Sequence, residues 1–504
     1  MKRAPLTLAA VAAALAAVTG VAALTLPAAE SAPAASGAAA ARLPVERSTL
    51  VCPQPSSSDV AETTYTSITP GGPGGPAGTG TERGAGGAAR LTGTGKEARQ
   101  LLELKEPGRP AAATASGADA PALTGTADGA LAPGWTAQAT TRVTAVQGRG
   151  LLGLTCTAPA TDFWFPAAST ANGRRDYVHL TNADDTPAVV DVQLFGPDGA
   201  VKSDTGPGAG ENIKVGPKSS VAVLLSTLAP GQIADLTARV TTRSGRVGAS
   251  VQSTEDAVGA DWLPASADPA PSLVLPGIPA DATSVRLVAY VPGEDDADLT
   301  VRLAGPGGPI SPAGNEQLHV KAGMTASLDL ADVTRGEAGS LVLAPADAKK
   351  AAPVVAALRV VRGTGAKQEV AFIPAAAPVG ARATVADNRA DAGATVLSLT
   401  APGADATVRV TASPGTQGGA PAVQEYTVKA GTTLAVPSPP VPGGDAKGAY
   451  ALTVETVSGG PVHAARTLSL PQDGIAMFTV QTLTDDRGTV AVPKAVQDYT
   501  VLGG

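Results

Sequence analysis

A module of about 107 residues recurs three times in roughly the last 300 residues of the chain, and this repeat constrains the fold more than any other feature. Each copy contains a short aliphatic stretch closed by a turn, at Val215–Ser219, Val320–Met324 and Val428–Thr432. A strand of small residues follows, at Val247–Ala249, Val355–Ala357 and Val462–Ala465. A period of this length indicates repeated structural units that stack on one another, and so favours a scaffold over a single catalytic domain.

An aromatic strand lies near the end of each copy. It reads Trp262-Leu263-Pro264-Ala265 in the first copy and Phe372-Ile373-Pro374-Ala375 in the second, and the third retains Phe478. Trp164-Phe165-Pro166-Ala167 lies about one period before Trp262, which indicates an earlier, degenerate copy. We therefore predict four units, at 45–167, 168–265, 266–375 and 376–490, with residues 1–44 before them and a C-terminal tail, 491–504, after them. If the units fold independently, a fragment that begins near Pro264 should be soluble and rich in β-structure.

Within a unit the apolar residues alternate with a period of two, as in Leu299-Thr300-Val301-Arg302-Leu303, which is typical of half-buried strands. Glycine and proline interrupt the chain too often for the crossover helices of a parallel α/β fold. About seven short strands in roughly 100 residues predict tandem immunoglobulin-like or fibronectin-like β-sandwiches. The main competitor is a β-propeller, whose blades are less than half this length.

The first unit also contains low-complexity segments at residues 70–76 and 84–87, which we expect to form a mobile loop. Charged residues are 16% of the chain and aromatic residues 3%, so each core must consist of Val, Leu and Ala with one aromatic anchor. The net charge is −7 and the basic residues do not cluster, which argues against nucleic acid as a partner.

Lys2 and Arg3 precede an apolar run over residues 4–29, which is the pattern of an export signal. The run is also long enough to remain as a membrane anchor, but its many alanines favour cleavage. In both cases the rest of the chain is expected outside the cytoplasmic membrane, as a secreted or cell-envelope protein that touches the membrane only through this segment.

Cys52 and Cys156 are the only cysteines, and an even pair in an exported chain predicts a disulfide. The bridge would close a loop of about 100 residues, worth about 4–5 kcal/mol in the chain-entropy model. A pair of free reactive thiols is the alternative, although the Cys-x-x-Cys spacing of redox sites is absent.

The sequence lacks the local motifs of the common enzyme classes. His179, His319 and His463 occupy non-equivalent places, without Cys or His at metal-ligand spacing. We expect no catalytic residue, no cofactor and no metal, with a hydrolase whose distant triad is not visible as the least favoured alternative. Acidic residues recur at one turn of the units, at Asp184-Asp185, Glu294–Asp298 and Asp405, and could contribute to calcium sites, but solvated turn residues are the simpler interpretation.

Trp135, Trp164, Trp262 and Phe372 are the prominent aromatic residues. Exposed rings of this kind can stack on sugars, which would make them a binding platform. Their recurrence at the repeat period favours a structural role, either as the plug of each sandwich or as the contact to the next unit.

Several segments of the first unit resemble those of DUF5719, a family of exported actinobacterial proteins without a known activity. They are Leu50-Val51-Cys52-Pro53, residues 132–138, residues 148–151 and residues 155–166. The resemblance implies an envelope or secreted location and carries no catalytic residue. The sequence therefore predicts an exported, non-catalytic scaffold or protein-interaction module of the cell envelope, with an envelope protein or glycan as partner. The runner-up is a polysaccharide-binding or envelope-assembly accessory protein, which requires Trp135, Trp164 or Trp262 to be exposed.

Overall fold

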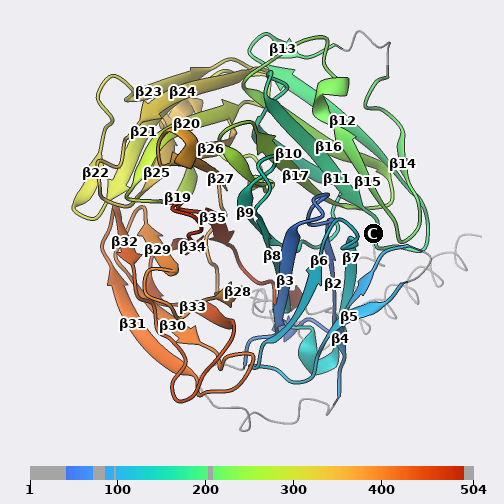
Figure 1. The fold of residues 1–504 in the computed structure, drawn as a ribbon. Helices are drawn as coiled ribbons and strands as arrows, with labels where there is room; N and C mark the ends of the chain where they lie inside the picture. The colour runs from blue at the N-terminus through green and yellow to red at the C-terminus, as the bar shows by residue number, and fades with distance from the viewer. Residues whose placement is uncertain (1–40, 72–85, 96–97, 203–207, 493–504) are drawn as a thin grey trace, which may run out of the picture. The chain divides into compact units, whose positions relative to one another are not determined.

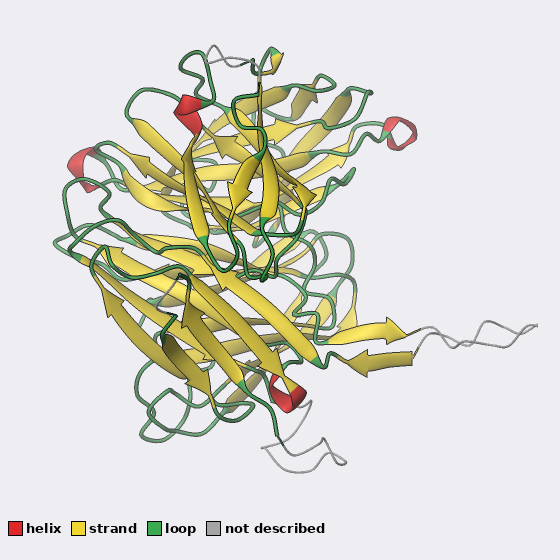
Figure 2. Cartoon of the chain, turned by 90° about the vertical axis from the view of Figure 1, so that its right-hand side faces the viewer, coloured by secondary structure: helices red, strands yellow, loops and turns green. Residues whose placement is uncertain are grey.

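The computed structural model describes residues 41–71, 86–95, 98–202 and 208–492. Strands make up most of this structure (Figure 2), and every strand pair in the described ranges is antiparallel. The helical turns of the described residues are short 3-10 segments in connections: η1 (Gly129–Leu131), η2 (Leu225–Thr227), η3 (Ala348–Lys350) and η4 (Gly365–Lys367). The expected all-β fold is confirmed.

By its contacts the chain divides into a compact part, Pro44–Thr489, and a terminal part, Met1–Leu43 with Val490–Gly504. Strand β1 (Ala41–Pro44) pairs with β36 (Thr489–Val492) in a two-stranded sheet. The predicted export segment and most of the low-complexity loop lie outside the described residues. Among the residues that are described, no helix has the length and apolar character needed to cross a membrane.

The remaining eight sheets form four sandwiches, each built around an apolar core shared by two sheets (Figure 1). The first sandwich pairs the sheet β2-β7-β4-β5 with the sheet β6-β3-β8-β9. Its strands are β2 (Arg47–Cys52), β3 (Ala61–Ile68), β4 (Ala89–Gly93), β5 (Gln100–Leu104), β6 (Ala111–Ser116), β7 (Leu123–Asp128), β8 (Thr136–Val143) and β9 (Gly150–Thr155).

The second sandwich pairs β10-β16-β12-β13, with β14 also on β12, with the sheet β15-β11-β17-β18. Its strands are β10 (Asp162–Ala168), β11 (Arg174–Thr181), β12 (Ala188–Gly196), β13 (Gly199–Ala200), β14 (Ile213–Val215), β15 (Ser220–Leu224), β16 (Leu236–Ser244), β17 (Gly248–Glu255) and β18 (Gly259–Leu263).

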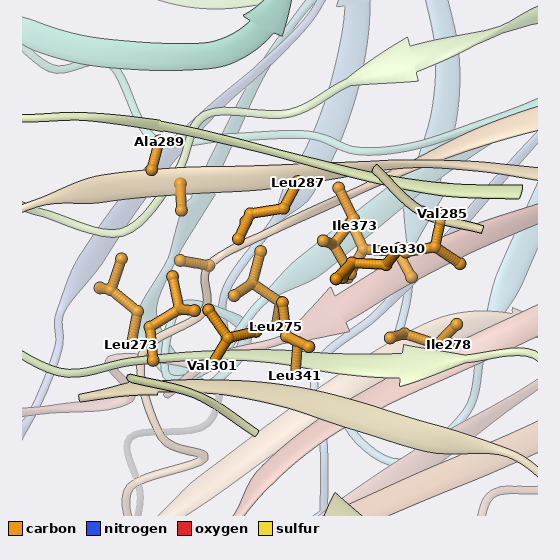
Figure 3. Close-up of a cluster of buried hydrophobic side chains, with 14 of the residues drawn as sticks. Leu273, Leu275, Ile278, Val285, Leu287, Ala289, Val301, Leu330, Leu341 and Ile373 are labelled. Carbon is orange, nitrogen blue, oxygen red and sulfur yellow. The ribbon is translucent and has the colours of Figure 1, made fainter. Parts of the chain in front are cut away.

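The third sandwich repeats this order, with β19-β25-β21-β22, and β23 on β21, against β24-β20-β26-β27. Its strands are β19 (Leu273–Ile278), β20 (Ala282–Tyr290), β21 (Ala297–Gly305), β22 (Gly308–Ile310), β23 (Gln317–Val320), β24 (Thr325–Ala331), β25 (Gly339–Pro345), β26 (Val355–Arg362) and β27 (Glu369–Pro374). Leu275, Leu287, Val301 and Leu341 come from both sheets and meet between them (Figure 3).

The fourth sandwich pairs β28-β33-β30-β31 with β32-β29-β34-β35. Its strands are β28 (Arg382–Asn388), β29 (Thr395–Ala401), β30 (Ala406–Ala412), β31 (Ala422–Val428), β32 (Thr432–Val436), β33 (Tyr450–Gly459), β34 (His463–Ser469) and β35 (Phe478–Leu483). In β30 the alternation is regular: Val408 and Val410 are buried, and Arg409 between them points to the partly exposed face.

One strand of the first repeat differs from the sequence interpretation. The expected boundary after residue 167 makes Trp164 part of the last strand of the first unit. In the structure Trp164 lies on β10, which pairs with β16 and so begins the second sandwich. The true last strand of the first sandwich is β9, which pairs with β8. Trp164 and Trp262 therefore occupy the first and the last strand of the same sandwich, in similar local sequence.

The four sandwiches contact one another in a closed cycle. The first strand of each sandwich contacts the second sheet of the next sandwich. These contacts are β2 with β17, β10 with β20 and β26, β19 with β29 and β34, and β28 with β3 and β8. The last contact joins the fourth sandwich back to the first. The compact part is thus a ring of four sandwiches.

The predicted disulfide is confirmed. Cys52 at the end of β2 is bonded to Cys156 just after β9, and the two lie 104 residues apart. The bridge therefore ties the first and the last strand of the first sandwich, and Cys52 is fully buried in its core.

Removing this disulfide should lower the free energy of unfolding by about 4 kcal/mol, because a bridge that closes a long loop restricts the unfolded chain strongly. The measurement is denaturant unfolding of the double variant Cys52→Ser, Cys156→Ser against the wild-type chain. Mass spectrometry without reduction provides the control, and two free thiols in the wild type would contradict the pairing.

Candidate functional site

The last strands of all four sandwiches, β9, β18, β27 and β35, meet in one place. Each contacts the next in a cycle: β9 with β18, β18 with β27, β27 with β35, and β35 with β9. In Figure 1 the labels β9, β27 and β35 lie between the sandwiches. We call these four strands the junction. It brings chemistry from four distant parts of the chain together, and so is the first place to look for a site.

Glycines let the strands of the junction approach closely. A Cβ atom added to Gly150 would lie 2.2 Å from the carbonyl oxygen of Ala260, and one added to Gly153 would lie 2.5 Å from Cγ2 of Thr479. Both distances are shorter than van der Waals contact. Strand β9 therefore needs glycine at these two positions in order to fit against β18 and β35.

Asp261 of the second sandwich is one of two acids in the junction. Its side chain is 1% exposed. Oδ1 accepts a hydrogen bond from the backbone N–H of Gly153, at 3.0 Å, and one from Oγ1 of Thr479, at 3.3 Å. Oδ2 is buried and has no hydrogen-bond partner among the described residues. A single carboxyl group thus links the second sandwich to the first and the fourth.

Glu369 of the third sandwich is the other acid, and it is fully buried. Its Oε1 accepts a hydrogen bond from the backbone N–H of Leu151 at 3.2 Å. Nε of Arg149 lies 3.9 Å from Oε2, but the same guanidinium donates to the carbonyl oxygens of Gln368, at 2.7 Å, and Val258, at 3.1 Å. Arg149 therefore neutralises Glu369 only in part, because its closest contacts are with the backbone.

Burial dominates the acid–base behaviour of both groups. Removal from water raises the pKa of Glu369 to about 8, against the smaller opposing effects of the Leu151 N–H and Arg149. Burial also raises the pKa of Asp261 well above its usual range, and the nearby Glu369 adds to this increase. Glu369 hence keeps its proton at pH values below about 8, where surface carboxyl groups are ionised, and the raised pKa of Asp261 favours its protonated form in the same way.

A second buried polar cluster lies beside the junction, where the fourth sandwich meets the first. The backbone N–H groups of Ala386 and Asp387 donate to Oε1 of Gln138, at 2.9 and 3.0 Å, and Thr140 donates to Asp387 at 2.5 Å. Arg389 pairs with the same carboxylate. These bonds close the ring between its two ends.

Arg466 lies between this cluster and the junction, fully buried and hydrogen-bonded to Gln481. Burial lowers its pKa to about 10, which the charge of Asp387 partly opposes.

The junction can hold protons, but a substrate cannot reach it. Catalytic acids work at a surface where a reacting group can come within hydrogen-bond distance. Asp261 and Glu369 are covered by strands from all four sandwiches, and their donors are backbone amides and a threonine of the same chain. The arrangement is that of an internal contact which holds the sandwiches together.

Asp261, Glu369, Arg149 and Arg466 were not among the site residues predicted from the sequence. Asp261 and Glu369 directly precede the recurring aromatics, by one and three residues, which was the available signal.

The aromatic residues are all buried, and three of the four serve contacts between sandwiches. Trp262 packs against Ala61, Leu152 and Leu154 of the first sandwich. Phe372 of the third sandwich belongs to the core of the second, under the guanidinium of Arg174.

Trp164 and Trp135 complete this set. The Trp164 ring stacks on Tyr290 of the third sandwich with 5.4 Å between centroids. Trp135 alone plugs its own sandwich, with Nε1 donating to Ser67 at 2.8 Å. The three tryptophans are 2–5% exposed, and a sugar ring cannot stack on them in this structure.

The histidines have separate surroundings. His179 is buried with its ring edge-on to Trp262, and burial lowers its pKa to about 4. His463 is also buried, and its Nδ1 lies 2.9 Å from the carbonyl oxygen of Ala376. His319 is exposed on β23, with Nδ1 at 2.7 Å from Asp298. Within the described ranges, no three His, Cys, Asp or Glu residues are grouped so as to hold a metal ion.

The recurring acidic residues stabilise the recurring turn. Asp296 accepts a hydrogen bond from the backbone N–H of Ala322 at 2.8 Å, and Asp405 accepts the equivalent bond from Ala430 at 2.8 Å. In the second sandwich Asp184 instead pairs with Arg246. The acids at this position thus have partners within the chain in three sandwiches, which favours the turn interpretation over calcium.

An open, mostly polar pocket of about 460 Å³ lies on the second sandwich. The loop before β11, the connection after η2 and the turn after β17 line it, including Asn172, Arg175, Gln232 and Asp256. Arg175 and Asp256 pair with each other at 2.9 Å. The lining carries no nucleophile with an adjacent base, and its charges are already balanced.

Comparison with known families places the chain beside one of unknown function. The model of DUF5719, described as a family of unknown function, matches residues 111–439. That range includes parts of all four sandwiches and covers well over half of the chain. No curated protein matches the sequence.

Proposed function

The chain belongs to the DUF5719 family, and we propose that it is an exported, non-catalytic scaffold that presents the rim of a four-sandwich ring to a protein of the cell envelope. The proposal rests on the location of the side chains that stand out in the repeats. The recurring aromatic residues and the acids beside them are buried in contacts between sandwiches. What the repeats build is one closed body with its loops and outer edge strands available for a partner.

Two further observations support parts of this proposal. The disulfide between Cys52 and Cys156 agrees with an oxidising compartment outside the cytoplasm. The exposed apolar side chains Ile310 and Val423, on outer strands β22 and β31, provide contact positions on the rim. Burial of the three tryptophans weakens the alternative of a polysaccharide-binding protein, because that function needs exposed rings.

The test is binding of the full chain to envelope preparations from the organism that produces it. One preparation is left intact, one is treated with protease, which removes protein and leaves glycan and lipid, and one is digested with glycan hydrolases. A protein-binding scaffold should bind saturably to the intact and the glycan-digested preparations, and lose binding after protease treatment. The opposite pattern would establish glycan binding. Absence of saturable binding to all three would contradict the scaffold proposal.

The contact surface can be located in the same experiment. A photo-crosslinking residue at Val423 should capture an envelope protein, while the same residue at the buried Val410 of the neighbouring strand β30 provides the matched control. Capture that persists in protease-treated envelope would contradict a protein partner.

A further inference from the structure

We propose that the junction is a pH-dependent latch: protonated Asp261 and Glu369 hold the four sandwiches closed, and loss of these protons to the solvent loosens the ring. The inference concerns the ring alone and does not depend on the partner. It rests on the convergence of β9, β18, β27 and β35, where two acids from different sandwiches are buried together.

The charge state of these two acids depends on whether the ring is closed. Each acid is contributed by one sandwich and receives its hydrogen bonds from others: Glu369 from Leu151, and Asp261 from Gly153 and Thr479. Opening the junction would return both carboxyl groups to water and separate them from these donors. A carboxyl group that is buried when the ring is closed and hydrated when it is open titrates differently in the two states.

The charges around the acids do not remove this difference. Strands β9 and β35 contain no titratable residue, and Asp261 and Glu369 are the sole titratable residues of β18 and β27. Arg149 reaches Glu369 at 3.9 Å. Arg362 of β26 lies directly across from Glu369, but its guanidinium pairs with Asp281 at 2.6 Å. Arg466 lies within electrostatic reach of Asp261 and of Asp387, which also pairs with Arg389. The three cations near the two acids, Arg149, Arg362 and Arg466, thus all interact with other groups as well.

The direction follows from the shifted pKa values. Burial raises the pKa of Glu369 to about 8 in the closed ring, so between its usual value and about pH 8 the closed ring binds more protons than the open one. Closure is therefore fully favoured at low pH and is progressively lost as the pH rises toward 8. The raised pKa of Asp261 acts in the same direction.

Buried histidines limit the range in which this effect is isolated. Burial lowers the pKa of His179 to about 4, and it also lowers the pKa of His463. Protonation of these groups in the open state opposes the acids below about pH 6.5, the ordinary histidine value. As the pH rises above that value the histidines become neutral in both states, and the acids dominate the slope.

Hydrogen exchange of the full chain at pH 6.5 and pH 8.5 tests the latch. The amides of Leu151 and Gly153 donate to the two acids and report opening of the junction, whereas the amide of Val178, inside the second sandwich, provides the reference. After correction for intrinsic exchange, the opening constant at the junction should rise by about tenfold or more over this interval, since one titrating group with a pKa near 8 suffices for such a change. The Val178 amide should not follow it.

Isosteric variants separate the latch from general alkaline weakening. The double variant Asp261→Asn, Glu369→Gln cannot ionise, so the increase in junction opening should disappear. Asp235→Asn is the matched control, because Asp235 also links two sandwiches, through Arg286 at 2.6 Å, but the Arg286 partner lowers its pKa despite burial. This control variant should raise the opening constant of the junction by the same factor at both pH values.

The infrared spectrum of the wild-type protein gives a second measurement that does not require the variants to fold. Buried carboxylic acids should show a protonated C=O stretch at pH 6.5 that fades as the pH rises to 9. Absence of this band at pH 6.5, or a double variant that keeps the wild-type pH dependence, would overturn the proposal.

Discussion

Replacing Trp262 by alanine should lower the free energy of unfolding by about 3–5 kcal/mol, the usual cost of truncating a large buried aromatic side chain. The ring is 2% exposed and packs between the second sandwich, where it meets His179, and the first, where it meets Leu152 and Leu154. Because the contact joins two sandwiches, both should lose stability. The measurement is denaturant unfolding of the full chain, followed by fluorescence and by circular dichroism.

Two further variants make this result specific. Trp262→Phe should lower the free energy of unfolding by less than Trp262→Ala does, because the third sandwich has a phenylalanine, Phe372, at the corresponding contact. Val423→Ala changes a side chain that is 60% exposed. The free energy of unfolding of this variant should lie within about 0.5 kcal/mol of the wild-type value. A Trp262→Ala chain as stable as the wild type would mean that the ring is not a packed contact, and would return it to the candidate binding residues.

The repeat predicted the fold because its period and its alternation are local properties. The turns at Val320 and Val428 occupy the same place in the third and fourth sandwiches, directly after β23 and β31. Local similarity led to a wrong prediction at Trp164, since the Trp-Phe-Pro-Ala of β10 resembles the Trp-Leu-Pro-Ala that begins within β18. Which strand a segment becomes is decided by its pairing partner. Here Trp164 of β10 pairs with Arg239 of β16, which lies 75 residues later in the chain.

The candidate site was less predictable than the fold, for a physical reason. Asp261 and Glu369 occupy ordinary strand sequences, and nothing in either strand requires a buried acid. They become neighbours only when the ring closes and brings β18 and β27 together. Closure depends on contacts between units that do not repeat exactly, such as Gln138 with the backbone of Ala386 and Asp387. A period identifies equivalent positions, but it does not predict how the units are arranged around one another.

The closed ring also changes the result expected for a fragment that begins near Pro264. From the repeat alone, its two sandwiches should be soluble and rich in β-structure. In the structure the third sandwich inserts Val288, Val370 and Phe372 into the core of the second. Each such side chain contributes about 1.5–3 kcal/mol when buried. The fragment exposes all of them, so it should aggregate or unfold without a cooperative transition, as monitored by light scattering and circular dichroism.

A repaired fragment distinguishes exposed contact surface from intrinsic instability of the two sandwiches. Phe372→Gln with Val370→Thr removes the main apolar side chains that the ring covers, and leaves Leu275, Leu287 and Leu341 of the third core unchanged. The repaired fragment should recover solubility, while the same two substitutions in the full chain should destabilise it, because they place polar groups in the core of the second sandwich. A native-like, cooperatively melting fragment without these substitutions would show that the sandwiches are independent units and that ring closure adds little to their stability.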